Sequence, residues 1–286
     1  LHLFVAGGVK AAAVRVIPNE ARKLSTLGLP PAFARQIARP HGLILVCGAT
    51  GAGKSTTLTS VIDDYNSNED LVIQTAEAPV EYQHEDRRCT IFQREVGLDI
   101  PTFAAAGRAF LRSDPDVIMF GELRDAETIG QAIRCANTGH MVLGTMHTGT
   151  AAAAIEQILQ SFPEADKAFY RTMLSQVLVA ALAQILVPAI GGGRQVVFEL
   201  MLNSPAIANL ILTEKPMLIR STIGSSSSEG MQTRDQALLR LVGDGRITEQ
   251  VCLESCIDRE ETVRKLAAMK APGGRSFAPP PLPKTK

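Results

Sequence analysis

Residues 48–55 have the types and spacing of a loop that could hold a phosphate chain. The stretch GATGAGKS places glycines at 48, 51 and 53, directly before Lys54 and Ser55, and fits the pattern G-x-x-x-x-G-K-S. Glycines let successive backbone N–H groups turn inward around a phosphate, and a following helix adds the positive end of its dipole. A lysine in this place reaches the β- and γ-phosphates, and the serine hydroxyl binds Mg²⁺. The pattern therefore predicts a site for ATP and Mg²⁺.

The elements around this loop support the prediction. An apolar run at 43–47 has the length of a strand, and residues 54–65 are compatible with a helix. A glycine-rich turn without a ligand is the alternative, and this strand–loop–helix setting disfavours it. The residues expected to contact the nucleotide are Gly48, Ala49, Thr50, Gly51, Ala52, Gly53, Lys54, Ser55 and Thr56.

A carboxylate that could act on water follows a second apolar strand. In DPDVIMFGELRD, residues 117–120 form the strand and Glu122 stands at its end. A phosphate-loop enzyme needs a carboxylate there to orient water or to bind the metal. We therefore expect Ser55 and Glu122 to hold Mg²⁺, the glutamate directly or through water. A surface acid without a role is the alternative.

Two further polar groups follow predicted strands. Glu77 and Glu81 come after residues 72–76, and His147 follows the apolar stretch 141–145. Because ligands of parallel α/β sheets bind at the carboxyl ends of the strands, these side chains are expected at one edge. Glu77 could reach the metal or the attacking water, and His147 could hydrogen-bond the γ-phosphate and report its loss. A solvated turn at Pro79 and a purely structural histidine are the alternatives.

Composition limits the class of protein. The chain has 286 residues, 45% of them apolar, and equal numbers of basic and acidic residues, 29 of each, so it can bury a core and carries no charge bias toward nucleic acid. Five cysteines without a C-x-x-C pair indicate reduced thiols in a cytosolic protein. The apolar run 177–187, interrupted by Gln184, is too short for a membrane helix and predicts a buried core helix. The first residues lack the features of a signal peptide.

The order of elements predicts an α/β fold. From residue 42, strands at 43–47, 71–76, 117–120 and 141–145 alternate with helices at 54–65, 103–112, 126–137 and 150–160, which indicates a parallel sheet covered on both faces. We further expect a strand through 13–17, a short helix opened by Pro30 and Pro31, a long buried helix over 167–183, a strand over 195–201, several short helices over 204–264 and a flexible loop at 225–228.

Four motifs in order give the chain a family resemblance. They are GATGAGKSTT, TAEAPVEYQH with the downstream QREVG, LRSDPDVIMFGELRDAETI, and TGHMVLGTMHT. With them, residues from about 14 to 258 resemble the PilT-type retraction ATPases of bacterial type IV pili, within the wider secretion ATPase superfamily. The resemblance implies a RecA-like P-loop core followed by a helical C-terminal region, with Glu122 as the catalytic carboxylate, Glu77 and Glu81 in an acidic box, and His147 as the phosphate sensor.

The resemblance also implies partners and a location. It implies a hexameric ring in which a neighbouring subunit inserts arginines into each site, and Arg15 is the matching position in this chain. It further implies a cytoplasmic motor held at the inner membrane by a platform protein, with no direct binding of nucleic acid. The implied domains are an N-terminal PAS-like remnant at 1–20, a linker at 21–41, the ATPase core at 42–202, C-terminal helices at 203–268 and a disordered proline-rich tail at 269–286.

Two departures from the family pattern keep other functions open. Ala78 stands where the family commonly has an aspartate, and Ala208 and Leu212 stand where the retraction branch usually has arginines. An ATPase of a type II or type IV secretion or conjugation system, and a weakly hydrolysing nucleotide-binding subunit, therefore remain alternatives. A DNA-translocating ATPase shares only the core fold, and the neutral net charge disfavours it.

Overall fold

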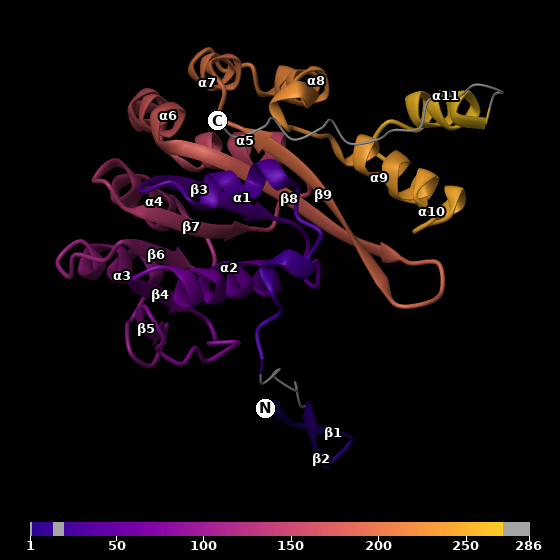
Figure 1. Cartoon of the computed structure of the whole chain (residues 1–286). Helices are drawn as coiled ribbons and strands as arrows, with labels where there is room; N and C mark the ends of the chain where they lie inside the picture. The colour runs from indigo at the N-terminus through magenta and orange to yellow at the C-terminus, as the bar shows by residue number, and fades with distance from the viewer. Residues whose placement is uncertain (1, 14–19, 271–286) are drawn as a thin grey trace.

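A mostly parallel sheet of seven strands forms the centre of the protein (Figure 1). The computed structural model describes residues 2–13 and 20–270. The strand order is β5-β4-β6-β7-β3-β8-β9, and only β9 runs antiparallel to its neighbour. The strands are β3 (Gly42–Cys47), β4 (Val72–Glu77), β5 (Thr90–Glu95), β6 (Val117–Phe120), β7 (Met141–Met146), β8 (Leu178–Pro188) and β9 (Arg194–Leu202). This architecture confirms the predicted α/β fold with its parallel sheet.

Helices cover both faces of the sheet because the buried strands are apolar on both sides. On β3, Leu43 and Leu45 pack into the core under α3–α7, whereas Ile44 and Val46 pack into the core under α1 and α2. All four side chains are at most 1% exposed. The helices involved are α1 (Pro31–Ile37), α2 (Lys54–Asn68), α3 (Phe103–Phe110), α4 (Ala126–Asn137), α5 (Ala151–Ser161), α6 (Glu164–Val177) and α7 (Pro205–Leu212).

The C-terminal part is helical, as expected, and has a small core of its own. Val187 and Val197, from the far ends of β8 and β9, pack there against Leu238, Leu239 and Cys252. The helices are α8 (Ile219–Ser225), α9 (Arg234–Gly243), α10 (Glu249–Ser255) and α11 (Arg259–Lys270), and short 3₁₀ turns are η1 (Leu24–Thr26), η2 (Pro216–Leu218) and η3 (Ser227–Glu229). Helix α11 includes Met269 and Lys270, which the sequence assigned to the tail, and residues 271–286 lie outside the described part.

Two sequence predictions of local structure are wrong. The long helix over 167–183 ends at Val177, and the apolar run that follows is strand β8 rather than a core helix. A continuous apolar run is compatible with a buried strand as well as a buried helix, and β8 lies between β3 and β9 inside the sheet. The loop expected at 225–228 is partly ordered, because it contains the end of α8 and the turn η3.

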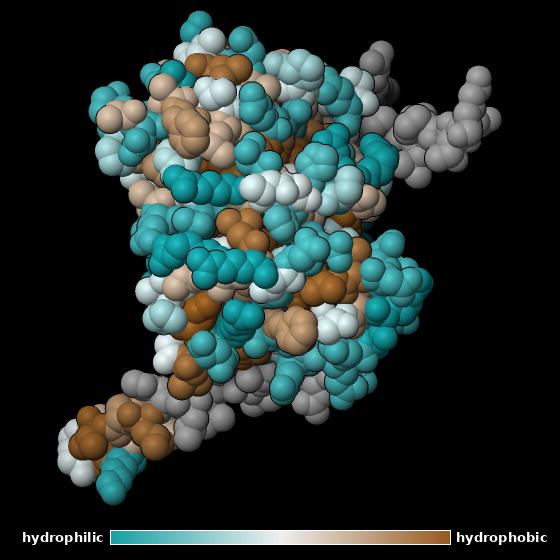
Figure 2. Space-filling view, turned by 90° about the vertical axis from the view of Figure 1, so that its left-hand side faces the viewer, coloured by the Kyte–Doolittle hydropathy of each residue, from teal (hydrophilic) through white to brown (hydrophobic). Residues whose placement is uncertain are grey.

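Among the described residues, strands β1 (His2–Ala6) and β2 (Val9–Ala13) pair with each other in a two-stranded hairpin. Its apolar side chains are exposed: Leu3 is 70%, Val5 69% and Val9 68% accessible. The hairpin is the largely brown projection at the lower left of Figure 2. The strand predicted through 13–17 falls mainly on residues 14–19, which lie outside the described part.

Candidate functional site

The phosphate loop follows β3 at the centre of the sheet, between β7 and β8. Gly48, Gly51 and Gly53 have φ values of +151°, +79° and +90°, a region of backbone space that side chains rarely occupy. At Gly48 there is a steric reason as well, since a Cβ atom would lie 2.5 Å from the carbonyl oxygen of Gln184. The loop is therefore restricted to glycine at these positions by backbone conformation.

Lys54 opens α2 and folds back over the loop. Its Nζ donates to the carbonyl oxygens of Gly48, at 2.8 Å, and Ala49, at 3.2 Å. The side chain is only 8% exposed, and burial lowers the pKa of the ammonium group, whereas the negative charge of Glu122 opposes that shift. A nearly buried cation beside inward-turned backbone is suited to a phosphate chain.

Glu122 lies at the end of β6 and is paired with two possible cations. His147 Nε2 lies 2.9 Å from Glu122 Oε1, and the guanidinium of Arg124 contacts the same oxygen. The loop that carries Glu122 is fixed by the backbone, because Leu123 donates to the carbonyl of Thr145 on β7 at 2.9 Å. The structure thus joins two residues that the sequence placed after two predicted strands of one sheet, and it shows that these strands, β6 and β7, are neighbours.

Glu77 ends β4, the next strand, in a different environment. Its Oε1 accepts hydrogen bonds from Thr75 Oγ1, at 2.6 Å, and from Gln93 Nε2, at 3.0 Å. Burial raises the pKa of the Glu77 carboxyl, and these two hydrogen bonds counteract part of that rise. Neutral donors rather than cations hold this carboxylate, and Gln93 comes from β5, a strand that the sequence analysis did not predict.

A cleft of about 90 Å³ lies beside the start of α2, and its lining brings Ser55 together with Glu77 and Glu81. In the described part of the chain, no three histidine, cysteine, aspartate or glutamate side chains are grouped to hold a metal ion. One hydroxyl and nearby carboxylates do fit Mg²⁺, which commonly takes few protein ligands and completes its shell with water and phosphate oxygens. The residues present are therefore compatible with a magnesium–nucleotide complex.

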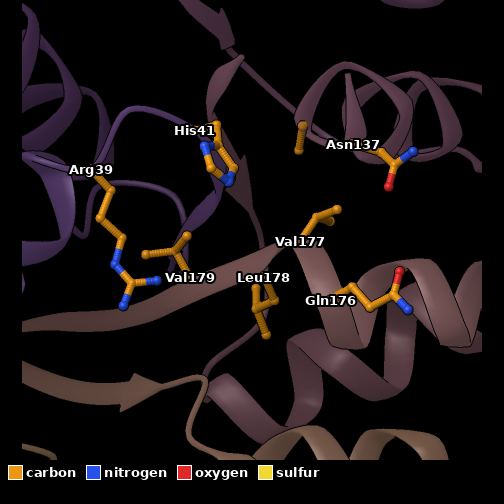
Figure 3. A pocket seen from close by; sticks show the side chains of 9 residues that line it. Arg39, His41, Asn137, Gln176, Val177, Leu178 and Val179 are labelled. Atoms are coloured by element: carbon orange, nitrogen blue, oxygen red, sulfur yellow. The ribbon is translucent and has the colours of Figure 1, made fainter. Parts of the chain in front are cut away.

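A larger hollow, of about 220 Å³, lies at the opposite edge of the sheet, where β3 and β8 begin (Figure 3). Arg39, His41, Asn137 and Gln176 surround it, and all four are exposed. Ligands of parallel sheets bind at the carboxyl ends of the strands, and the predicted site residues Ser55, Glu77 and Glu81 line the smaller cleft there, so we take the smaller cleft as the candidate functional site.

Two residues missed by the sequence analysis hold the loop after His147. Glu199 of β9 is 2% exposed, and its Oε1 accepts from the backbone N–H of Ala151 at 2.8 Å. Arg234, at the start of α9, contacts the carbonyl of Gly149 through its guanidinium group. Burial raises the pKa of the Glu199 carboxyl, and its bond from Ala151 opposes the rise. Nothing local in the sequence predicts these contacts, because the partners are far apart along the chain.

The remaining predicted site residue, Arg15, lies outside the described residues, so its prediction stays untested. The other predicted positions gather at the ends of four adjacent strands, β4, β6, β7 and β3. Within the described part, no helix is long and apolar enough to cross a membrane.

Comparison with known proteins gives the family. A family model described as Type II/IV secretion system protein matches residues 3–195, about two thirds of the chain. The chain belongs to this family.

Members of the family with curated names cover most of the chain. The type IV pilus retraction ATPase PilT of Pseudomonas aeruginosa is 44% identical over 239 residues, which is 84% of this chain and 70% of that protein. A twitching motility protein of Neisseria gonorrhoeae is 40% identical over 251 residues, 87% of this chain and 67% of that protein. The predicted resemblance to PilT-type ATPases is thus confirmed.

Solved structures agree with the fold. The crystal structure of the pilus retraction motor PilT with bound ADP matches with a TM-score of 0.85 and 42% identity, over 92% of this chain and 75% of that one. The ATPase DotB of Legionella pneumophila matches with a TM-score of 0.79 and 30% identity, over 87% of this chain and 70% of that one. These matches confirm the RecA-like core with its C-terminal helices.

Proposed function

We propose that this chain is an ATP-hydrolysing motor subunit that powers the retraction of type IV pili. The observation that carries the proposal is the meeting of the phosphate loop with Glu77, Glu122 and His147 at four adjacent strand ends. The similarity to PilT, whose solved structure contains ADP, supports a nucleotide as the ligand and a pilus as the load.

In the proposed reaction, the loop and its lysine bind the phosphate chain. Backbone N–H groups of residues 48–56 donate to the phosphate oxygens, and Lys54 moves from its contacts with the carbonyls of Gly48 and Ala49 to the β- and γ-phosphates. Ser55 and Glu122, the glutamate directly or through water, would hold Mg²⁺, which would supply positive charge to the phosphates. These groups stabilise charge in the transition state without a covalent intermediate.

Glu122 is the residue proposed to orient the attacking water. Its contact with His147 holds the carboxylate at the end of β6, and His147 is placed to respond when the γ-phosphate leaves. Glu77 and Glu81 line the cleft beside Ser55, and their carboxylate oxygens would lie near a bound Mg²⁺ and contribute negative charge there. Release of phosphate would then alter the contacts of His147 and with them the loop tied to Glu199 and Arg234.

The proposal includes a ring of identical subunits, with six as the expected number, acting on a membrane platform from the cytoplasmic side. In such a ring Arg15 of one chain would enter the site of its neighbour and neutralise charge there. For the same reason, we expect the monomer to hydrolyse ATP slowly and the assembled ring to hydrolyse it fast. Mass photometry with and without ATP measures the assembly that this part of the proposal requires.

The test is Mg²⁺-dependent ATP hydrolysis by the purified protein, compared with Lys54→Ala. Hydrolysis that disappears in Lys54→Ala supports the proposal, and background hydrolysis by the assembled wild type contradicts it. Lys265→Ala is the matched control, because Lys265 pairs with Glu261 on α11 away from the loop. Deleting the gene then tests direction: excess surface pili indicate retraction, whereas bald cells indicate assembly and overturn the retraction proposal.

A weakly hydrolysing nucleotide-binding subunit is the second candidate, and the surroundings of Glu77 favour it. That carboxylate is followed by Ala78 rather than a second acid, and its own oxygen is occupied by Thr75 and Gln93. Under this alternative the assembled protein binds ADP with the affinity of an active motor yet turns ATP over at background rate.

A further inference from the structure

We propose that Gln184 of β8 is a positioning residue that aims the phosphate loop, acting through the peptide bond between Ala52 and Gly53. The inference rests on the proposed function, since it assigns Gln184 a role in nucleotide binding. Gln184 is the polar residue that interrupts the apolar run 177–187, and it is 2% exposed. A polar side chain in such surroundings is costly unless its donors and acceptors are satisfied.

Both ends of the Gln184 amide are used, and both contacts lead to the phosphate loop and its helix. Nε2 donates to the carbonyl oxygen of Ala52 at 2.7 Å, and Oε1 accepts from the hydroxyl of Thr57 at 3.0 Å. The orientation of the amide follows from chemistry, because a backbone carbonyl can only accept and must therefore face the NH₂ group. The Gln184 side chain thus bridges the tip of the loop and the first turn of α2.

The contact with Ala52 has a consequence on the other side of the peptide plane. In a trans peptide, the carbonyl of one residue and the N–H of the next point in opposite directions, and the bond between Ala52 and Gly53 is not among the cis bonds of the described chain. Holding the carbonyl of Ala52 toward β8 therefore turns the N–H of Gly53 away from β8. That N–H belongs to the set proposed to donate to phosphate.

The backbone of Gln184 fixes the other end of the loop. Strand β8 pairs with β3 up to Cys47 and Ala183, so Gln184 comes directly alongside Gly48. A Cβ atom at Gly48 would lie 2.5 Å from the Gln184 carbonyl oxygen, and one at Gly53 would lie 3.2 Å from Nε2. Gln184 of β8 therefore lies close to the backbone at both ends of the phosphate loop, at Gly48 and at Gly53, where only glycine fits.

The experiment measures the dissociation constant of Mg²⁺–ADP by calorimetry for the full chain and for Gln184→Met. Methionine has a similar size but cannot donate to Ala52, and its thioether sulfur is only a weak acceptor for Thr57. Loss of one well-aimed N–H to a charged phosphate is expected to weaken ADP binding roughly tenfold to a hundredfold. Gln195→Met is the matched control, because Gln195 lies on β9 and its side chain bonds to Val196 and Arg246, away from the phosphate loop; its ADP affinity should equal that of the wild type.

A second variant, Gln184→Glu, separates aiming from simple support of the fold. An ionised carboxylate cannot donate to the Ala52 carbonyl, whereas a protonated one can donate there and still accept from Thr57. Burial favours the protonated form, so the change falls in an accessible pH range. The ratio of the ADP dissociation constants of Gln184→Glu and wild type should therefore shrink as the pH falls from 8.5 to 6, while the ratio for Gln184→Met stays constant.

The outcomes are distinguishable from failure of the proposed function. If the wild type does not bind ADP, the proposed function fails before Gln184 is tested. If the wild type binds and a folded Gln184→Met binds equally well, the positioning role is overturned. A pH-independent ratio of the ADP dissociation constants of Gln184→Glu and wild type also overturns the positioning role, and this test remains available where Gln184→Met does not fold. A residue that only supports the fold would change the melting temperature and would not make this ratio depend on pH.

Discussion

Glu77 and Glu122 stand at the ends of neighbouring strands, yet the protein holds them in opposite ways. Glu77 is half-buried, accepts hydrogen bonds from the neutral groups of Thr75 and Gln93, and has a carboxyl pKa raised by desolvation. Glu122 faces His147 and Arg124 through one oxygen. Desolvation without a cationic partner disfavours the charged form of the Glu77 carboxylate. The sheet therefore offers one carboxylate suited to act on water and one suited to shape the cleft.

The largest expected effect is on turnover in Glu122→Gln. A residue that orients or deprotonates the attacking water contributes roughly 100- to 10,000-fold, so the kcat for ATP hydrolysis should fall by at least about 100-fold, while the binding of ADP without Mg²⁺ changes little. Steady-state kinetics and calorimetry measure the two quantities. Glu127→Gln is the control, because Glu127 pairs with Arg108 on the surface. Unchanged turnover in Glu122→Gln would remove Glu122 from the mechanism.

A smaller loss of turnover is expected in Glu77→Gln. The amide keeps the shape of the side chain and removes a charge that lines the cleft with Ser55, so we expect kcat to fall roughly tenfold, as for residues that tune a metal site from outside its first ligands. A titration with Mg²⁺ at fixed ATP gives the apparent metal affinity in the same experiment. A loss as large as that of Glu122→Gln would erase the distinction between the two carboxylates.

The stability of the fold provides a third comparison. A raised pKa of Glu77 means that the folded state binds a proton more readily than the unfolded state. The protonated carboxyl therefore stabilises the fold below its ordinary pKa of about 4.5. That stabilisation is lost as the pH rises through the raised pKa of the folded state. Glu77→Gln should thus be more stable than wild type near pH 7.5, with the difference shrinking toward pH 4.5. Urea unfolding across this range measures it, and a pH-independent difference would contradict the assignment.

The smallest effect is expected in Arg124→Ala. The Arg124 side chain is 73% exposed, so water and salt screen its attraction to Glu122, and His147 still contacts the carboxylate. The urea midpoint should stay the same, and kcat should change by less than about threefold. Arg124→Ala could instead lose much of its turnover, and added salt could cause the same loss in the wild type. That result would show that Arg124, and not His147, holds Glu122 in its active position.

Much of the site was predictable because its candidate residues belong to short sequence motifs that follow predicted strands. The loop 48–55, Glu122 and His147 each follow an apolar run of strand length, and parallel strands bring their carboxyl ends together. These signals need only local sequence. The predicted roles of the residues are a separate matter, which the kinetic experiments test.

The residues that support the site were not predictable in the same way. Gln93 reaches Glu77 from β5, and Glu199 reaches Ala151 from β9, and such partners become visible only when the sheet order is known. Gln184 left a signal, since it interrupts an apolar run, but the run was interpreted as a helix. On a helix its neighbours would have been different, so the error in secondary structure concealed the contact with the phosphate loop.

Strand β8 also has a mechanical consequence. Val187, three positions after Gln184, packs in the core of the C-terminal helices, and three residues of extended strand span only about 10 Å. The three consecutive glycines at 191–193 lie beyond that contact, and the intervening segment is paired with β9. The phosphate loop and the C-terminal helices therefore both contact strand β8, and the short paired segment between the two contacts leaves no room for a hinge. A tilt of β8 at the phosphate loop would therefore also move the C-terminal helices.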